Sequence, residues 1–488
     1  MGIAETLSDI FDPLNTYIWY IAFVCLIGLG LYFAYRLKVM QITHMGENAK
    51  LALSGVSEGK GDKRLSSFEA FCLGMGARIG VGNIAGVATA IVTGGPGAVF
   101  WMWIFALIGA GTSFFESTAA QIYKERKSDG SYYGGPAYYA TKGLKSRKLG
   151  IALAFMIFVT FGIGFVGVQA NNSADAIATA FEIDPTIVGA LIAFLAAIII
   201  FSGTKIVGVF SSRVVPAMAV LWIILALAVI CVNFQNVGNA IYMIFQYAFS
   251  GPAIVGGGIG TVIMVGLKRG VFSNEAGLGS IANIAGTAHT THPVKQGLMQ
   301  SFGVIVDTLI VCTFTALAVL SFGDWSQIEA LCYNADHEII LQKAPLVMYV
   351  ASQAVGPWAS TVIALFLFVF AFTSMLGYYT MSEANMRFIK DNNLLIFVVR
   401  LIIVVVAFAS CLINVSLMDT ISDTFMAAMG AINVVVVALL AKPVMEAYHD
   451  YREQKKNGIK EPIFTKDVLS DPSGVTEWDS PQEEGAEE

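Results

Sequence analysis

Two glycine-rich segments of an otherwise apolar chain hold the residues whose types and spacing could bind a small charged ligand. Residues 74–86 contain five glycines with Arg78 and Asn83 between them, and residues 266–279 place Glu275 among further glycines. Glycine weakens a helix, and unwound backbone at membrane depth is tolerated where it lies within protein or lines a water-filled cavity. The N–H and C=O groups freed in this way can hold a substrate and its coupling ions.

The first segment also permits a purely structural interpretation. Gly76 with Gly80, and Gly82 with Gly86, form small-xxx-small pairs, which let membrane helices pack closely. Arg78 favours the functional interpretation, because a charge near mid-bilayer usually faces a polar cavity or a partner.

The second segment permits an alternative topology. Lys268 and Arg269 could end the preceding helix, and the residues after them would then form a cytoplasmic loop. Residues 281–286 are apolar enough to enter the bilayer. We therefore expect an outer loop helix over 240–254 and a broken crossing over 256–288.

The composition identifies the class of protein that must position these segments. Of 488 residues, 56% are hydrophobic and 13% are charged, whereas an ordinary soluble domain is about 25% charged. This excludes an ordinary soluble enzyme and a disordered chain, and a net charge of −6 leaves no basic face for nucleic acid. The sequence predicts an all-α polytopic membrane protein.

The hydropathy pattern predicts about 11 transmembrane helices. A bilayer core requires about 20 predominantly apolar residues per helix. We interpret the first segment as a retained span, because no signal-peptide cleavage pattern follows it. The approximate limits are 14–36, 67–93, 98–123, 149–181, 186–204, 214–234, 240–288 (including the outer loop helix), 296–322, 346–376, 393–413 and 419–441.

The positions of basic residues predict the orientation in the membrane. Twenty-four of the 29 Lys and Arg residues fall in alternate loops and in the tail after residue 441, whereas the intervening loops contain only Lys343. Cytoplasmic loops carry the excess of Lys and Arg. We therefore expect a multi-pass protein of the plasma (inner) membrane with its N-terminus outside and its C-terminus in the cytoplasm.

The two glycine-rich segments fall five spans apart and divide the chain. Residues 1–66 would form an extracellular N-terminus, an extra span and a cytoplasmic loop. Residues 67–234 and 235–441 would form two five-helix repeats, each with a broken first helix. An odd number of helices per repeat inverts one repeat relative to the other. Residues 442–488 form an acidic tail, which we expect to be cytoplasmic and disordered.

Four motifs in this order resemble the alanine or glycine:cation symporter family, the sodium:alanine symporters. They are GVGNIAG at 80–86, GGPGAVFWMW at 94–103, GGPAYY at 134–139 and RGVFSNEAGLGS at 269–280. The resemblance implies a leucine-transporter-like fold of inverted five-helix repeats. It also implies sodium-coupled uptake of a small neutral amino acid such as alanine or glycine. The acidic tail lies outside this resemblance.

An amino acid brings a carboxylate and an ammonium group into a dry site, and both charges must be matched. Backbone N–H groups at a helix break, with the half-helix dipole behind them, suit the carboxylate. The candidates are Gly80, Val81, Gly82 and Asn83. The ammonium group needs acceptors, and the freed carbonyls of Phe272, Ser273 and Asn274 are suitable.

Polar side chains on the fourth span could also face the ligand. Gln169 and Asn172 are three residues apart and share a helix face. Hydrogen bonding between helices is an equally good explanation for both. If they are functional, Gln169 is the better candidate for substrate binding.

Glu275 could pair with Arg78 or Arg269, or could carry a proton. We favour a structural charge pair, because an unpaired carboxylate inside the membrane would be more costly.

The resemblance to the leucine-transporter fold implies a sodium site between the second and ninth spans. Sodium is a hard cation that takes oxygen ligands. The implied ligands are the carbonyls of Gly76 and Ile79 and the hydroxyls of Thr373 and Ser374. Without the fold argument, bonding of these hydroxyls to their own helix is the simpler interpretation.

Two other functions compete with a sodium-coupled importer. A proton-coupled carrier would use Glu275, Glu116 or Asp307 as the titrating group. A channel is less favoured, because no ring of charged or filter residues is evident. The chain lacks the common hydrolase and metalloenzyme motifs, so we expect no enzyme, no cofactor other than sodium as the coupling ion, and no obligatory protein partner.

Overall fold

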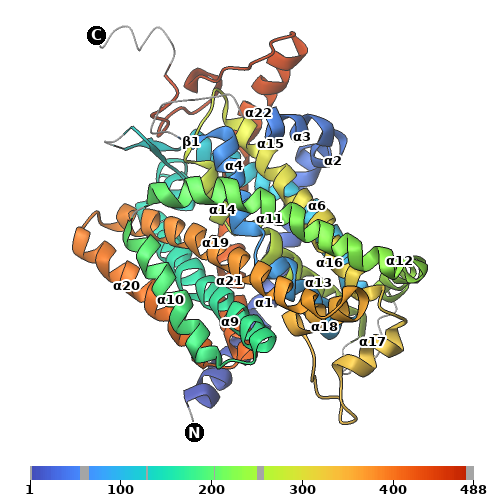
Figure 1. Cartoon of the computed structure of the whole chain (residues 1–488). Helices are drawn as coiled ribbons and strands as arrows, with labels where there is room; N and C mark the ends of the chain where they lie inside the picture. The colour runs from blue at the N-terminus through green and yellow to red at the C-terminus, as the bar shows by residue number, and fades with distance from the viewer. Residues whose placement is uncertain (1–2, 55–64, 128–129, 203, 250–257, 480–488) are drawn as a thin grey trace.

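The computed structural model describes residues 3–54, 65–127, 130–202, 204–249 and 258–479, and these residues are mostly helical (Figure 1). Within these ranges, eight helices are long and apolar enough to cross a membrane. They are Glu5–Arg36, Gly97–Ile122, Arg147–Phe181, Val214–Val232, Pro293–Leu320, Trp358–Ile389, Asn393–Leu412 and Val415–Leu439.

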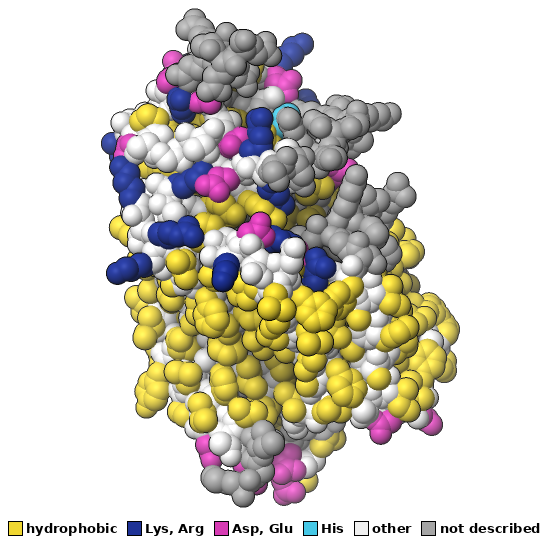
Figure 2. Space-filling model, turned by 90° about the vertical axis from the view of Figure 1, so that its left-hand side faces the viewer, with side chains coloured by type: hydrophobic (Ala, Val, Ile, Leu, Met, Phe, Trp, Pro, Cys, Tyr) yellow, Lys and Arg dark blue, Asp and Glu magenta, His cyan; other side chains and the backbone are white. Residues whose placement is uncertain are grey.

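Figure 2 shows hydrophobic side chains covering a broad belt, with Lys and Arg side chains gathered along one edge of the belt on the face in view. An apolar belt of this kind matches the hydrocarbon core of a bilayer. The shape therefore agrees with a multi-pass membrane protein.

The N-terminal region contributes a long helix that lies against the rest of the protein. Helix α1 contacts α21 and α6, so the extra N-terminal span is packed onto the helices around it. The elements of this region are α1 (Ile3–Arg36), α2 (Met40–Thr43), α3 (Met45–Ser54) and β1 (Leu65–Ser66).

The region predicted as the first repeat begins with an interrupted helix. The capping box formed by Ser66 and Glu69 fixes the start of α4. The elements are α4 (Ser67–Arg78), η2 (Val81–Asn83), α5 (Ala85–Gly94), α6 (Gly97–Ile122), β2 (Glu125–Arg126), β3 (Tyr132–Tyr133), α7 (Pro136–Lys142), α8 (Arg147–Ile157), the π-helix η3 (Phe158–Phe165), α9 (Val166–Phe181), α10 (Pro185–Ser202) and α11 (Thr204–Val232).

The following region also contains an interrupted helix. Strand β4 pairs in parallel with β1, so the chain after this second interruption is joined to the chain before the first. The elements are α12 (Phe234–Phe249), α13 (Gly258–Asn274), α14 (Ser280–Ala285), β4 (Ala288–His289), α15 (Pro293–Val304), the π-helix η5 (Ile305–Cys312), α16 (Thr313–Leu320), α17 (Trp325–Cys332), α18 (Lys343–Val355), α19 (Trp358–Ile389), α20 (Asn393–Ala409), η6 (Ser410–Leu412) and α21 (Val415–Leu439).

Two predicted span limits are wrong. The segment predicted as one helix over 346–376 is two helices, α18 and α19, and the second continues to Ile389. Gly356, with φ of 107°, and Pro357 separate them, because proline cannot continue a preceding helix. The outer loop helix predicted over 240–254 is α12, which starts earlier, at Phe234. Residues 250–254 lie outside the described residues.

The prediction that residues 442–488 are disordered is wrong for 442–479. Helix α22 (Ala441–Lys456) and the short helix η7 (Lys466–Val468) fold there, and α22, at the top of Figure 1, contacts α6 and α15. Phe464 and Trp478 are only 2% and 7% exposed. These apolar anchors were obscured in the sequence by the acidic residues around them. Residues 480–488 lie outside the described residues.

The chain that follows the second interrupted helix makes a close backbone contact, between Gly286 and Gly134, with the chain that precedes α7. An added Cβ on Gly286 would lie 2.5 Å from the Gly134 Cα. Gly134 precedes α7 and Gly286 follows α14. Only glycine at both positions allows this approach of backbone to backbone.

We predict that Gly286→Ala lowers stability by roughly 1–3 kcal/mol, because the new methyl group must displace backbone. The check is the thermal unfolding temperature of the purified protein in detergent. The matched control is Gly28→Ala on α1, where an added Cβ meets nothing within 4 Å. Equal unfolding temperatures for the two variants would contradict the prediction.

Candidate binding site at the two helix breaks

The first helix break lies at Gly80, as predicted. Helix α4 ends at Arg78, Gly80 is extended with φ of −137°, and α5 starts only at Ala85. The Gly80 N–H donates to Asn83 Oδ1 at 3.0 Å, and the Val81 N–H donates to Gln169 Oε1 at 3.1 Å. Backbone donors freed by the break are therefore met by side-chain oxygens.

The second break starts at Glu275, two residues after Ser273, the middle of the predicted segment 272–274. Ser273 and Asn274 form the last turn of α13, and Glu275, Gly277 and Gly279 have positive φ values of 56°, 87° and 72°. The break is therefore confirmed, but it follows the Phe272–Asn274 segment instead of passing through it.

A buried acid that the sequence suggested only as a possible proton carrier holds this second break. Glu116 of α6 accepts hydrogen bonds from the N–H groups of Gly277 at 3.3 Å and Gly279 at 3.0 Å. Asn433 of α21 donates to both Glu116 and the Gly277 carbonyl. The sequence shows Glu116 as an acid inside an apolar span. Residue spacing does not reveal that its partners are the Gly277 and Gly279 N–H groups.

The two breaks lie against one another. An added Cβ on Gly82 would lie 3.1 Å from Phe272 Cδ1 and 3.2 Å from Ser273 Cα. Arg78 Nε donates to the Asn274 carbonyl at 2.8 Å. The residues predicted from two distant motifs therefore meet at one place.

Asp307, in the π-helical segment η5, joins the two breaks through its carboxylate. Asn83 Nδ2 donates to one oxygen at 2.6 Å and Ser273 Oγ donates to the other at 2.7 Å. Thr308 donates to the same carboxylate at 3.0 Å. π-Helical turns are often found at functional sites, and this one brings an acid to the junction of both interrupted helices.

The predicted charge pair of Glu275 is wrong for Arg269, whereas Arg78 interacts with Glu275 electrostatically without a direct ion pair among the described residues. Arg269 pairs with Asp423, and Glu275 accepts a hydrogen bond from the Tyr378 hydroxyl at 2.7 Å. Residues six apart do not share a helix face, and Glu275 lies beyond the end of α13, which turns its carboxylate towards α19.

Arg78 is neutralised by polar groups and by carboxylates at longer range. Besides the Asn274 carbonyl, its guanidinium donates to Gln300 Oε1 at 3.2 Å and to Ser113 Oγ at 2.9 Å. With 2% exposure it is one of the largest fully buried side chains among the described residues. Its role is to bind the end of α13 to α4 across the site.

Two predicted ligands, Gln169 and Ser374, lie beside Gly80. An added Cβ on Gly80 would lie 2.7 Å from Ser374 Oγ and 3.0 Å from Gln169 Nε2. Ser374 Oγ donates to the Gly76 carbonyl at 3.0 Å. Thr373 instead donates to the Phe370 carbonyl of its own helix at 2.9 Å.

Asn172 also turns away from the site, because it donates to the Val168 carbonyl of its own helix at 3.0 Å. The interhelical role is therefore not seen for Asn172. Gln169 is the polar side chain of this span that reaches the break.

Aromatic side chains line one side of the site. The Phe272 ring lies 4.9 Å from Phe165, and Phe165 lies 5.4 Å from Tyr378, centroid to centroid. The Tyr378 hydroxyl oxygen also lies 3.0 Å from the Ala77 carbonyl oxygen. The walls are therefore apolar beside the polar break, as in most small-molecule sites.

Charged residues cover Phe272 on the side towards α18. The Arg269 guanidinium carbon lies 5.6 Å from the centre of the Phe272 ring. Arg269 lies 3.9 Å from Asp419, which also pairs with Lys343 at 2.9 Å. Beyond them, a cavity of about 380 Å³ is lined in part by Asp175 and Lys343. A chain of contacts therefore runs from Phe272 through Arg269 and Asp419 to Lys343, which lines this cavity.

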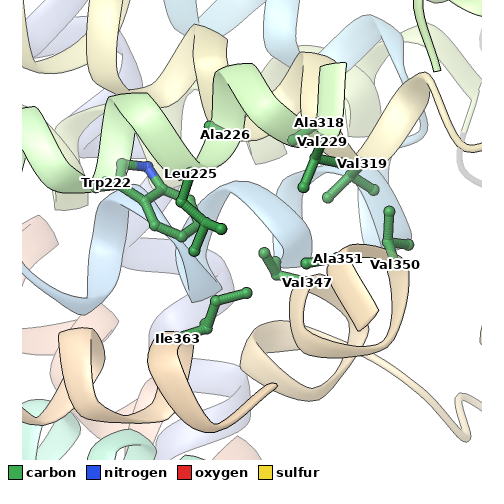
Figure 3. A pocket seen from close by; sticks show the side chains of 10 residues that line it. All are labelled: Trp222, Leu225, Ala226, Val229, Ala318, Val319, Val347, Val350, Ala351 and Ile363. Carbon is green, nitrogen blue, oxygen red and sulfur yellow. The ribbon is translucent and has the colours of Figure 1, made fainter. Parts of the chain in front are cut away.

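Figure 3 shows a different cavity, between α11, α16, α18 and α19, with a volume of about 10 Å³. All of its lining side chains, such as Trp222 and Ile363, are apolar apart from the indole N–H, which donates to Thr315. It holds at most about one water molecule and offers nothing to match the charges of an amino acid.

Comparison with known proteins places this architecture in one family. The profile of the sodium:alanine symporter family matches residues 4–466. The probable sodium/glutamine symporter GlnT of Bacillus subtilis is 40% identical over 97% of this chain and 96% of its own length. The sodium/alanine symporter AgcS of Methanococcus maripaludis is 36% identical over 92% of this chain and 98% of its own length.

Solved structures support the fold. MhsT in complex with L-phenylalanine aligns with a TM-score of 0.52 at 13% identity, over 87% of this chain and 95% of MhsT. A sodium-coupled sialic acid symporter aligns with a TM-score of 0.50 at 15% identity, over 90% of this chain and 86% of that structure. Both are membrane transporters, and at this identity they bear on the fold alone. From the match across residues 4–466 and from relatives that share more than a third of its residues, this chain belongs to the sodium:alanine symporter family.

Proposed function

We propose that this protein is a secondary active transporter that couples entry of sodium to uptake of a small neutral amino acid such as alanine or glycine. The observation that carries the proposal is the meeting of two interrupted helices, at Gly80–Gly82 and after Asn274, inside an apolar protein. Helix breaks at this depth supply charges and dipoles without ionised side chains. Membership of a transporter family supports the same conclusion.

The substrate carboxylate would bind at the first break. Side-chain oxygens of Asn83 and Gln169 accept from the Gly80 and Val81 N–H groups. These oxygens stand where carboxylate oxygens would be placed. Gln169 would move aside or contact the substrate as the carboxylate enters.

The substrate ammonium group would bind at the end of α13. The N–H groups of Ala276 and Gly277 would normally bond to the Phe272 and Ser273 carbonyls. They donate instead to Asn274 Oδ1 and to Glu116, so these two carbonyls lose their helical partners. The Asn274 carbonyl, the third predicted acceptor, already receives Arg78.

The sodium ion would lie between α4 and α19. Ser374 Oγ and the Gly76 carbonyl are 3.0 Å apart, so both oxygens can turn to one cation, as a hard cation requires. The Ile79 carbonyl lies at the same helix end. Thr373 would have to rotate away from the Phe370 carbonyl to join them.

The membrane arrangement would have eleven crossings. The eight long apolar helices would be joined by the shorter apolar α10 and by the interrupted pairs α4–α5 and α13–α14. Two inverted five-helix repeats would then follow α1. The basic edge of the apolar belt would face the cytoplasm, together with the C-terminus.

A second candidate function is proton-coupled transport, and the position of Asp307 favours it. This fully buried carboxylate contacts both breaks through Asn83 and Ser273. A proton or a second cation at Asp307 would change its hydrogen bonds to both interrupted helices. The same geometry would also serve a purely structural carboxylate.

We predict that Ser374→Ala raises the sodium concentration for half-maximal uptake by about tenfold, since a lost ion contact is worth about 1.5–3 kcal/mol. Uptake of radiolabelled amino acid into proteoliposomes at graded sodium concentrations is the measurement. Thr380→Ala is the matched control, because the Thr380 hydroxyl donates to its own helix at Leu376. Unchanged sodium dependence in Ser374→Ala would remove Ser374 from the ion site.

We predict that Gly82→Ala reduces uptake about tenfold or more, because its methyl group would press on Phe272 and the Ser273 backbone. Gly86→Ala on the same segment should be tolerated, since its Cβ would meet Phe272 at an ordinary 3.7 Å. Initial uptake rates of the two variants, with folding checked by size-exclusion chromatography, give the comparison. Equal activity would place the substrate elsewhere.

We predict that an imposed sodium gradient drives uptake and that a proton gradient in sodium-free buffer does not. A competition panel of alanine, glycine, serine and glutamine, with and without sodium, identifies the preferred substrate. Undiminished uptake without sodium would favour the proton-coupled alternative. In that case Asp307→Asn should abolish the proton-driven component.

A further inference from the structure

We propose that residues 460–479, here called the C-terminal strap, form a latch that holds the inner ends of both interrupted helices and slows their opening. The proposal goes beyond the transport function, because it concerns regulation and does not depend on which amino acid or ion is carried. It starts from the segment between α14 and α15, residues 286–292, which the strap contacts on two sides.

The first contact is direct. The Phe464 N–H donates to the Thr291 carbonyl at 3.0 Å, and the Thr291 hydroxyl donates to the Pro462 carbonyl at 2.9 Å. Lys295, at the start of α15, pairs with Glu461 at 3.0 Å. The first part of the strap is therefore tied to the chain that follows α14.

The second contact runs through a buried lysine. Lys124 is 2% exposed, and its ammonium group lies 4.2 Å from the Tyr132 ring centre and 4.4 Å from that of Trp478. It donates to the Ala288 carbonyl at 3.1 Å. A cation between two aromatic faces is stabilised most when it is shielded from water, so Trp478 keeps this ammonium on Ala288.

Trp478 is itself fixed at the end of α6. Its indole N–H donates to the Gln121 carbonyl at 2.9 Å. The Gln121 side-chain amide donates to the carbonyls of Ala285, the last residue of α14, and Ala288. A single residue, Gln121, therefore connects Trp478 to the end of the second interrupted helix.

Ala288, which accepts from Lys124 and Gln121, also connects the strap to the first interrupted helix. Ala288 belongs to β4, which pairs with Leu65 of β1, and Ser66 of β1 caps α4. Opening of the inner face must separate these short elements. The strap is compact enough to resist this, because the Phe464 and Trp478 rings lie 5.4 Å apart and the Lys466 N–H donates to the Trp478 carbonyl.

Charge complementarity guides the strap to this surface. Glu477 pairs with Arg126 at 3.1 Å, and Asp471 pairs with Lys145 at 3.2 Å. Exposed pairs of this kind contribute little stability individually. The acidic residues therefore select the docking surface, and the buried aromatic anchor supplies most of the attachment.

The test compares Trp478→Ala with the wild-type full-length protein by hydrogen exchange of backbone amides. We expect exchange of residues 280–292 to accelerate about tenfold or more, because the latch lowers the probability of local opening. The matched control is Trp358→Ala, since this tryptophan is 54% exposed at the start of α19. Faster exchange in the strap alone, with residues 280–292 unchanged, would overturn the proposal.

A second pair of variants keeps the test valid if Trp478→Ala misfolds. Arg126→Glu places two carboxylates against each other while Trp478 stays in place, so we expect exchange of residues 280–292 to accelerate less than in Trp478→Ala. Adding Glu477→Arg should restore the pair and return this exchange to the wild-type rate. If the double variant does not return exchange to the wild-type rate, the proposed docking of the strap through Glu477 and Arg126 is wrong. Hydrogen exchange needs no substrate, so this result is independent of the assignment of the amino acid or sodium. Uptake of the amino acid selected by the competition panel should rise in the variants with faster exchange.

Discussion

The structure depends on the need of unwound backbone to find partners where the surroundings are apolar. A broken helix inside a membrane exposes N–H and C=O groups that water cannot reach, and each unsatisfied group costs several kcal/mol. Glu116 and Asn433 meet this need at the second break, and Gln169 meets it at the first. The acids and amides of the protein interior are therefore placed by the two interruptions.

The same constraint explains why the breaks lie together. Arg78 spans from the end of α4 to the Asn274 carbonyl, and Asp307 joins Asn83 to Ser273. Arg78 of the first interrupted helix bonds the second directly, and Asp307 accepts hydrogen bonds from both. In the proposed symporter, these contacts would couple the substrate to the ion, since each must favour the same conformation.

Two sets of contacts flank the site, one towards α18 and one at the ends of α4 and α14. Phe272, Arg269 and the pairs to Asp419 and Asp423 cover the break on one side. On the other side, the short β1–β4 pairing and the C-terminal strap bind the ends of α4 and α14. The energetic cost of transport would lie in releasing these two sets of contacts in turn.

The sequence by itself determined the membrane class, the position of the first break at Gly80 and, within two residues, that of the second. Hydropathy and glycine spacing are local properties, and they act on the backbone at the place where they occur. The tertiary structure alone decided which residues become partners. Arg269 pairs with Asp423 and not with Glu275. Ser374 bonds to Gly76, whereas Thr373 bonds to its own helix. The described part of the acidic tail is held in place through Trp478. These outcomes depend on the rotation and tilt of helices far apart in the chain, which residue spacing does not specify.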